Sequence, residues 1–359
     1  MVKISVIMSV YNTKERWLRE SIESILAQTY SNFEFIIILD RPTDDSCRIV
    51  KEYEQRDSRI IVLNNPVNLG LTKSLNLGLK NAKGEYIARM DSDDVSVSTR
   101  FKKQVEYLEK NEDVAVVGSL VNVFDEDGNH SIGMNNNCRD FETNRIKMMF
   151  CNAGVAHSTA MIRKKFLDDN QLNYDKSMKK AQDYGLWTDI IINNGKIDVI
   201  NEILLDYRCH SNQITQMCSD EQIKCIKNNM YKQIKYYLDY ELSQDEMDIN
   251  FKLFRDFTSL SKKETEIYLN KLLRLSKMSD KINTKKFFRE IYAMWLYGTL
   301  KTIKTKKNFE FFLSKITFLS LRPSYILYAI QKKKSDKKYK HILKRYLKKI
   351  KKERKFYEK

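Results

Sequence analysis

The stretch GEYIARMDSDD, residues 84–94, carries more structural information than any other part of this chain. An apolar run that begins at Tyr86 has the length of a β-strand, and it ends in the carboxylates Asp91, Asp93 and Asp94. Carboxylate oxygens are hard ligands, suited to a divalent cation that also binds phosphate oxygens. A solvated acidic turn explains the same residues, so the surrounding segments have to decide between a ligand site and a plain turn.

Strand and helix patterns alternate along the first half of the chain. The predicted strands are residues 4–10, 33–39, 60–63, 86–90 and 114–123, and the predicted helices are residues 15–28, 46–55, 71–82 and 99–111. The run FEFIIIL at residues 33–39 is apolar apart from one glutamate, which is typical of a strand buried on both faces. This alternation predicts an α/β fold, with a mostly parallel sheet and helices on both faces.

Ligands bind beyond the carboxyl ends of the strands in sheets of this kind. The loops that follow positions 10, 39 and 90 are therefore expected to converge on one crevice. Residues 129–212 show no comparable pattern and are expected to be irregular, whereas purely helical patterns continue from Glu221. The chain accordingly divides into an α/β domain, an all-helical extension and a lysine-rich amphipathic tail, at residues 1–215, 216–330 and 331–359.

The net charge of +17 is concentrated in the tail. From Gln331 onward, fifteen Lys and Arg face three acidic residues, which gives +12 and leaves +5 for the rest of the chain. Apolar residues at helical spacing in this tail favour a helix on an anionic membrane surface. A solvated basic helix or a nucleic-acid contact are the alternatives, but no nucleic-acid module is recognisable, so no nucleic-acid partner is expected.

The chain is expected to be cytoplasmic and peripheral at the inner face of the cell membrane. The six cysteines are scattered without a CxxC pair or zinc spacing, which indicates reduced thiols. No apolar segment is long enough to predict a membrane span. The first ten residues read as a strand rather than a signal peptide, because the apolar run is short and no cleavage site follows.

The phosphate-binding loops of common nucleotide folds are absent from the sequence. Neither GxxxxGK[ST] nor a GxGxxG after the first strand is present. The strand-end loops instead offer Asp40, which can accept a hydrogen bond from a base, and the aspartates of residues 91–94. A diphosphate bound without a glycine loop suggests binding through a metal ion.

Two segments carry a family resemblance: VIMSVYNTKERWLRESIESILAQTYSNFEFIIILDRPTDDS at residues 6–46 and NLGLTKSLNLGLKNAKGEYIARMDSDD at residues 68–94. Together with later motifs, they resemble family 2 glycosyltransferases of the GT-A fold over residues 2–212. The resemblance implies an inverting enzyme with a nucleotide-sugar donor, a UDP-sugar by default, and Mn²⁺ or Mg²⁺ as cofactor. The implied acceptor is a lipid-linked or growing bacterial surface glycan.

The resemblance also assigns site residues. The residues that it places at the donor nucleotide are Val10, Tyr11, Asp40, Lys73, Asp91 and Ser92. Asp93 matches the likeliest direct metal ligand, with Asp91 near the metal or the ribose, and Asp94 extends the acidic cluster. The structural alternatives are a helix or turn cap for Asp40 and an N-cap of the next short turn for Asp94. Leu39 and the Arg41-Pro42 pair depart from the family's Asp and Gly-Ser, which leaves the nucleotide preference open.

Asp183, in the segment KAQDYGLW, matches the family's catalytic base, and Gln182 stands where the family usually has Glu. A neutral neighbour should leave Asp183 with a lower pKa than a glutamate would. A helix cap is the alternative role for Asp183. His157, Arg208 and His210 are possible diphosphate or acceptor contacts, with a structural role equally open for the histidines.

The predicted function is metal-assisted, inverting sugar transfer to a glycan hydroxyl, with an aspartate as base. Two other functions remain open from the sequence. One is a binding protein on a transferase scaffold that has lost its activity. The other is a membrane-binding or nucleic-acid-binding protein that acts through the basic tail.

Overall fold

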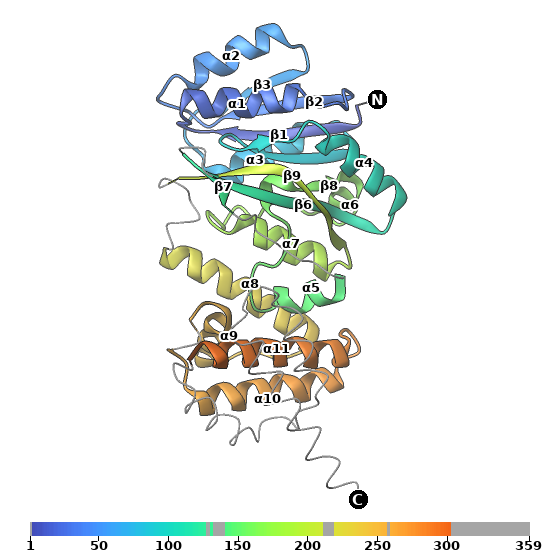
Figure 1. Cartoon of the computed structure of the whole chain (residues 1–359), viewed down its shortest axis with the longest axis vertical. Coiled ribbons are helices and arrows are strands. Elements are labelled where there is room, and N and C mark those ends of the chain that lie inside the picture. The colour runs from blue at the N-terminus through green and yellow to red at the C-terminus, as the bar shows by residue number, and fades with distance from the viewer. Residues whose placement is uncertain (1, 127–129, 132–140, 211–218, 257–258, 303–359) are drawn as a thin grey trace, which may run out of the picture. The chain divides into compact units, whose positions relative to one another are not determined.

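The computed structural model describes residues 2–126, 130–131, 141–210, 219–256 and 259–302. Figure 1 shows its elements in chain order. Two compact units are present: residues 1–145 with 152–229, and residues 146–151 with the chain from 230 onward. The basic tail, residues 331–359, for which a membrane-surface helix is predicted, lies outside the described residues.

The first unit is built on one sheet. Its strands are β1 (Ile4–Val10), β2 (Phe33–Leu39), β3 (Ile60–Asn64), β4 (Tyr86–Asp91), β5 (Val95–Ser96), β6 (Val114–Asp125), β7 (His130–Ser131), β8 (Met161–Arg163) and β9 (Lys196–Cys209). Its helices are α1 (Glu15–Leu26), α2 (Ser46–Arg56), α3 (Leu71–Asn81), α4 (Arg100–Lys110), α6 (Lys164–Asp169) and α7 (Gln182–Ile192), with a 3-10 turn at His157–Thr159.

The sheet is parallel in its first half and mixed in its second. The strand order is β3-β2-β1-β4-β8-β6-β9-β5, and β7 pairs with β6. β1 pairs in parallel with β2 and β4, and β2 pairs in parallel with β3. β8 is antiparallel to both β4 and β6, whereas β6 and β9 are parallel. The short β8 therefore marks the change between the two halves.

Helices cover both faces of the parallel half, as the sequence predicts. Alternate residues of β1, from Ile4 to Val10, pack in one buried cluster with apolar residues of α1, α2 and α4. Ile7 points to the opposite face, where a Cβ on Gly78 of α3 would lie 2.6 Å from its side chain. The alternation of side chains along a strand produces these two layers.

The register brings the carboxyl ends of the parallel strands together. Val10 of β1 lies opposite Leu39 of β2, and Ser9 lies opposite Asp91 of β4. β4 ends at Asp91, so the acidic segment begins where the neighbouring strands also end. The three loops therefore begin at one edge of the sheet, as predicted, whereas a crevice between them stays a prediction.

The expectation that residues 129–212 are irregular is wrong for the part that the structure describes. This part contains α5 (Phe141–Met148), the 3-10 turn, β8, α6, α7 and the 14-residue β9. β8 has only three residues, too few to show an alternating pattern. The pairing of β9 with β6 contains register shifts, and such bulges interrupt the two-residue alternation that identifies a strand.

The described residues beyond β9 form helices only, as predicted. They are α8 (Asp220–Leu238), α9 (Gln244–Arg255), α10 (Lys262–Met278) and α11 (Thr284–Thr302). α9 begins with a capping box, in which the Ser243 side chain accepts from the Glu246 backbone N–H and the Glu246 side chain accepts from that of Ser243. Within the described ranges, no helix combines the length and the apolar character that crossing a membrane requires.

Candidate active site

Side-chain hydrogen bonds tie the strand-end loops to one another. Asn12 accepts from the Thr43 backbone N–H at 2.8 Å, which joins the loop after β1 to the loop after β2. Thr13 and Ser92 share a hydrogen bond of 2.7 Å between their hydroxyls. Ser21 of α1 donates to the Asp91 carbonyl at 2.8 Å. The acidic turn, residues 91–94, is therefore held both by the loop after β1 and by α1.

Asp91 is paired with a cation from its own strand. Arg89 is only 2% exposed, and its Nη2 donates to Asp91 Oδ1. Burial raises the pKa of Asp91, Arg89 opposes that rise, and Asp93 adds to it. Arg89 also acts electrostatically on Asp183. The positive charge of Arg89, inside a central strand, thus acts on both Asp91 and Asp183.

Asp93 is paired with His210, which lies just beyond the end of β9. His210 Nε2 is 2.8 Å from Asp93 Oδ2, and the imidazole packs against Trp17 with 4.7 Å between the ring centroids. No group of three or more His, Cys, Asp or Glu in the described residues is arranged to hold a metal ion. The carboxylate fits Mn²⁺ or Mg²⁺, and the imidazole fits the transition metal Mn²⁺, if diphosphate oxygens and water complete the shell.

Asp94 is fully buried and forms part of the turn's framework. Its Oδ1 accepts from the Arg208 backbone N–H at 3.0 Å. Burial raises the pKa of Asp94 well above its ordinary value, and the neighbouring Asp93 and Asp91 raise it further. Asp94 therefore holds β9 against the acidic turn.

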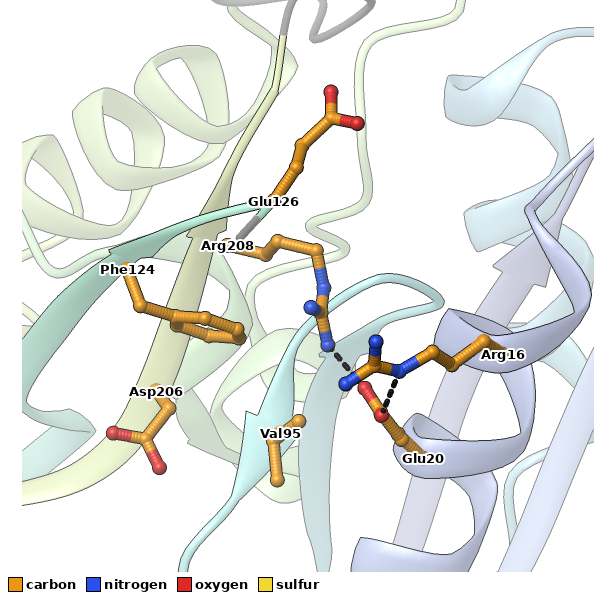
Figure 2. A pocket seen from close by; sticks show the side chains of 7 residues that line it. All are labelled: Arg16, Glu20, Val95, Phe124, Glu126, Asp206 and Arg208. Carbon is orange, nitrogen blue, oxygen red and sulfur yellow. Dashed lines mark hydrogen bonds and ion pairs between the residues drawn. The ribbon is translucent and has the colours of Figure 1, made fainter. Parts of the chain in front are cut away.

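Arg208 lies between the acidic turn and α1. Its Nε donates to the Asp93 carbonyl at 2.8 Å, and its Nη2 lies 2.5 Å from Glu20. Figure 2 shows Arg208 reaching toward Glu20, which also binds Arg16. These residues line a pocket of about 250 Å³ together with Val95, Phe124, Glu126 and Asp206. In this structure the guanidinium braces the turn, and a diphosphate contact by Arg208 stays a prediction.

Asp40 is 2% exposed and accepts three hydrogen bonds from the chain itself. Its donors are Asn65 Nδ2 at 2.7 Å and the backbone N–H groups of Leu69 and Gly70 at 2.8 Å. A carboxylate has about four acceptor positions, so about one remains for a ligand. The arrangement gives Asp40 a clear role in fixing the start of α3, while base recognition stays a prediction.

Asp183 lies in the first turn of α7, where backbone N–H groups favour a carboxylate. Burial raises its pKa, whereas the Tyr184 backbone N–H and the Asn152 side chain lower it. Asn152 Nδ2 donates to Asp183 Oδ2 at 2.9 Å. Asp183 is also close enough to Asp91 to raise the pKa of that carboxyl. The structure therefore brings the candidate base to the acidic turn.

His157 lies in the same region without direct contact to the acidic turn. Its Nε2 is 2.7 Å from the Tyr174 hydroxyl, and its ring packs edge-on against Trp187 with 6.2 Å between centroids. Burial lowers the pKa of His157 well below its ordinary value, and Arg89 lowers it further. His157 is therefore neutral, which leaves hydrogen bonding rather than charge as its possible contribution to a ligand.

The remaining predicted nucleotide contacts differ in their accessibility. Tyr11 is 49% exposed at the end of β1, so its ring is available to a base. The Val10 side chain is buried in the core, and its carbonyl accepts from the Asp40 backbone N–H at 3.0 Å. Lys73 is exposed on α3, and Ser92 bonds to Thr13. Any contact from Val10 to a nucleotide would have to come from its backbone.

Sequence reasoning missed two polar residues of this site, Arg89 and Asn152. A signal existed for Arg89, because a charged residue inside an apolar strand that is buried on both faces needs a partner. Asn152 precedes a glycine in a loop, and nothing in its local sequence indicates that it approaches Asp183.

Comparisons with known proteins give a consistent result. Residues 5–171 match the model described as Glycosyl transferase family 2. A protein of Methanocaldococcus jannaschii named as an uncharacterized glycosyltransferase is 40% identical over 207 residues, covering 57% of this chain and 70% of the relative. The Escherichia coli UDP-Glc:alpha-D-GlcNAc-diphosphoundecaprenol beta-1,3-glucosyltransferase WfaP is 31% identical over 235 residues, covering 65% and 87%. The Escherichia coli O-antigen biosynthesis glycosyltransferase WbnJ is 33% identical over 238 residues, covering 65% and 89%.

Solved structures share the fold. TarS of S. aureus in complex with UDP has a TM-score of 0.53 and 18% identity, covering 84% of this chain and 88% of TarS. The mannosyltransferase PcManGT from Pyrobaculum calidifontis, in complex with GDP-Man and Mn²⁺, has a TM-score of 0.51 and 13% identity, covering 85% and 88%. At these identities the likeness establishes the architecture alone.

Proposed function

Because this chain belongs to glycosyl transferase family 2 and is a glycosyltransferase, we propose that it transfers a sugar from a UDP-sugar to a hydroxyl of a surface glycan. The likeness to solved transferases also confirms the predicted GT-A fold with a helical C-terminal region. The names of WfaP and WbnJ support a lipid-linked or growing surface polysaccharide as the acceptor. A nucleoside diphosphate sugar as donor is supported by the complexes of TarS and PcManGT.

One observation carries this proposal: the carboxylates of Asp91 and Asp183 lie within electrostatic range of each other, although 92 positions separate them in the sequence. Asp91 and Asp93 come from the end of β4, whereas Asp183 comes from the start of α7. A transferase needs two groups of side chains close together, one that binds the donor and one that activates the acceptor.

Asp183 would act as the base in the transfer step. The acceptor oxygen attacks the anomeric carbon while its proton passes to the Asp183 carboxylate. The bond between the anomeric carbon and the diphosphate oxygen breaks, and the bonding electrons leave with the nucleoside diphosphate. Attack opposite the leaving group inverts the anomeric centre. Burial raises the pKa of Asp183, and therefore its basicity, which suits this role.

Asp93 and His210 are the side chains that would hold a divalent cation, with Asp91 beside them. When bound, such a cation supplies positive charge that stabilises the departing diphosphate. Asp91 is already paired with Arg89, so Asp93 is the carboxylate more available for a metal. Tyr11, whose ring is 49% exposed at the end of β1, would stack on the nucleobase.

The base assignment is tested with Asp183→Asn. The substitution keeps the shape and removes the charge, so we expect transfer and donor hydrolysis to fall by at least about 100-fold, as for the loss of a general base. Binding of UDP with Mn²⁺, measured by calorimetry, should change less than about threefold, because the Asp183 side chain accepts its hydrogen bond from Asn152, which is not a predicted donor contact. Asp189→Asn, on the same helix, is the matched control and should leave both quantities unchanged.

Two results would contradict the proposal. Unchanged turnover in Asp183→Asn would remove Asp183 as the base. Binding of UDP-sugars without hydrolysis or transfer, with any acceptor or metal tested, would instead indicate a binding protein on a transferase scaffold.

A further inference from the structure

The loop that begins at Asn152 packs along one face of α7. Asp183 and Trp187 are four positions apart, so they lie one above the other on this helix. A Cβ on Gly154 would lie 2.6 Å from Trp187 Cδ1, which shows how closely the loop approaches the indole. Two positions earlier, the Asn152 side chain donates to Asp183 Oδ2 at 2.9 Å. The loop therefore approaches α7 at two residues that are one turn apart: Gly154 lies against Trp187, and Asn152 donates to Asp183.

We propose that Asn152 is the positioning residue of the base: its amide holds Oδ2 of Asp183 and fixes the rotation of the carboxylate. This inference rests on the proposed function, in which Asp183 takes the acceptor's proton. With Oδ2 held by the amide, Oδ1 is the oxygen that receives this proton. Each carboxylate oxygen has two lone pairs, so backbone N–H groups at the start of α7 do not prevent it.

The charged and titratable groups that interact with Asp183 come from two parts of the fold, β4 and the segment before α7. Arg89 of β4 lowers the pKa of Asp183, and Asp183 raises the pKa of Asp91 in β4 and of Tyr174 in the segment before α7. Arg89 favours the ionised carboxylate, Asp91 opposes it, and Tyr174 stays protonated because burial raises its pKa. A substitution of Asn152 removes a neutral hydrogen-bond donor to Asp183 and leaves the charged groups around this carboxylate unchanged.

The test compares Asn152→Ala and Asn152→Asp with Asn193→Ala. Asn193 is an exposed asparagine at the other end of α7, and its side-chain amide donates to the Asp189 carbonyl at 2.8 Å. The first readout is the titration of the Asp183 carboxyl carbon by NMR in the donor-free protein, assigned through its loss in Asp183→Asn. Removing a donor that favours the ionised form raises the pKa of Asp183.

We expect the titration midpoint to move up by about one pH unit in Asn152→Ala, and further in Asn152→Asp, whose carboxylate repels that of Asp183. Asn193→Ala should titrate as the wild type does. An unchanged midpoint in both Asn152 variants would overturn the inference, and this holds whether or not the protein has measurable activity.

The second readout is hydrolysis of UDP-glucose and UDP-N-acetylglucosamine with Mn²⁺ between pH 5 and 8. The acid limb of kcat should move to higher pH in Asn152→Ala by the same amount as the NMR midpoint, with KM for the donor unchanged. A purely structural role would lower kcat at every pH without moving the limb. If the midpoint moves but Asp183→Asn retains full activity, the proposed function fails while Asn152 is still shown to control the carboxyl.

Discussion

At the scale of single residues, Arg89 shows how the site tolerates several carboxylates in a small space. Its guanidinium is buried, pairs with Asp91, and its Nη1 donates to the Ile7 carbonyl at 3.3 Å. Its Nε has no hydrogen-bond partner among the described residues, so the cation is not fully satisfied. A buried charge is costly unless it is paired. We interpret Arg89 as a fixed counter-charge that keeps Asp91 and Asp183 ionised together.

His157 gives a pH-dependent prediction. Burial keeps the folded-state pKa of His157 well below 6.5, whereas the unfolded chain binds a proton near that pH. Below about pH 6.5 the unfolded state therefore binds more protons, and stability falls as the pH falls. The slope approaches about 1.4 kcal/mol per pH unit for one group. Denaturant unfolding at pH 7.5 and 5.5 should show about 1 kcal/mol more loss in the wild type than in His157→Gln.

The comparison between the two proteins isolates His157, because all other titrating groups are shared. Glutamine retains a side chain able to bond to the Tyr174 hydroxyl, so the partner is not left buried and unsatisfied. Equal losses of stability in both proteins would show that His157 becomes protonated in the folded state.

The candidate site aspartates could be named from the sequence because each belongs to a local pattern. Asp91 and Asp93 end an apolar strand, and Asp183 stands in a recognisable segment before a helix. Asn152 could not be predicted, since its function depends on a contact across 31 positions of sequence. The same limit applies to Asp40, whose three hydrogen-bond donors lie 25 to 30 positions away.

At the scale of elements, the packing of the loop on α7 is the feature that sets the geometry of the base. Trp187 is fully buried, and Gly154 lies against its ring. An alanine at position 154 would force the loop away from the helix, because close-packed interiors have no room for an extra methyl group. The strain should appear both in the stability of the first unit and in the titration of Asp183.

We therefore predict that Gly154→Ala lowers the free energy of unfolding by about 1–3 kcal/mol, the usual cost of overpacking. It should also raise the pKa of Asp183 in the same direction as Asn152→Ala, because the amide moves away with the loop. Lys80→Ala, on the exposed surface of α3, is the control and should change stability by less than about 0.5 kcal/mol. Wild-type stability in Gly154→Ala would show that the loop adjusts without cost.

Elements with strong periodicity were predicted with accurate bounds. β1 and β2 have the residues expected from the sequence, since their runs are apolar and bounded by turn residues. β8 and β9 were missed because one is very short and the other is interrupted by register shifts. The pairing of β8 between β4 and β6 is a tertiary property that no local pattern encodes.

At the scale of the whole molecule, charge is distributed unevenly along the sequence. The chain from Gln331 onward carries +12 of the total +17, with apolar residues at helical spacing. We propose that this tail holds the enzyme at an anionic membrane surface, where a lipid-linked acceptor would be found. Each basic residue close to such a surface contributes about 1 kcal/mol to binding.

This proposal predicts an effect of charge that depends on position in the chain. The tail variant replaces four basic residues with glutamine: Lys344, Arg345, Lys348 and Lys349. The matched control replaces four exposed lysines of the first unit: Lys51, Lys80, Lys102 and Lys110.

In sedimentation with vesicles containing phosphatidylglycerol, the tail variant should bind at least about 100-fold more weakly than the wild type, whereas the control should bind within about threefold. Binding should also fall as salt rises, because counterions screen the attraction. Equal weakening in both variants would show that overall charge, rather than the tail, governs binding. Binding to RNA but not to the vesicles would assign the tail to nucleic acid instead.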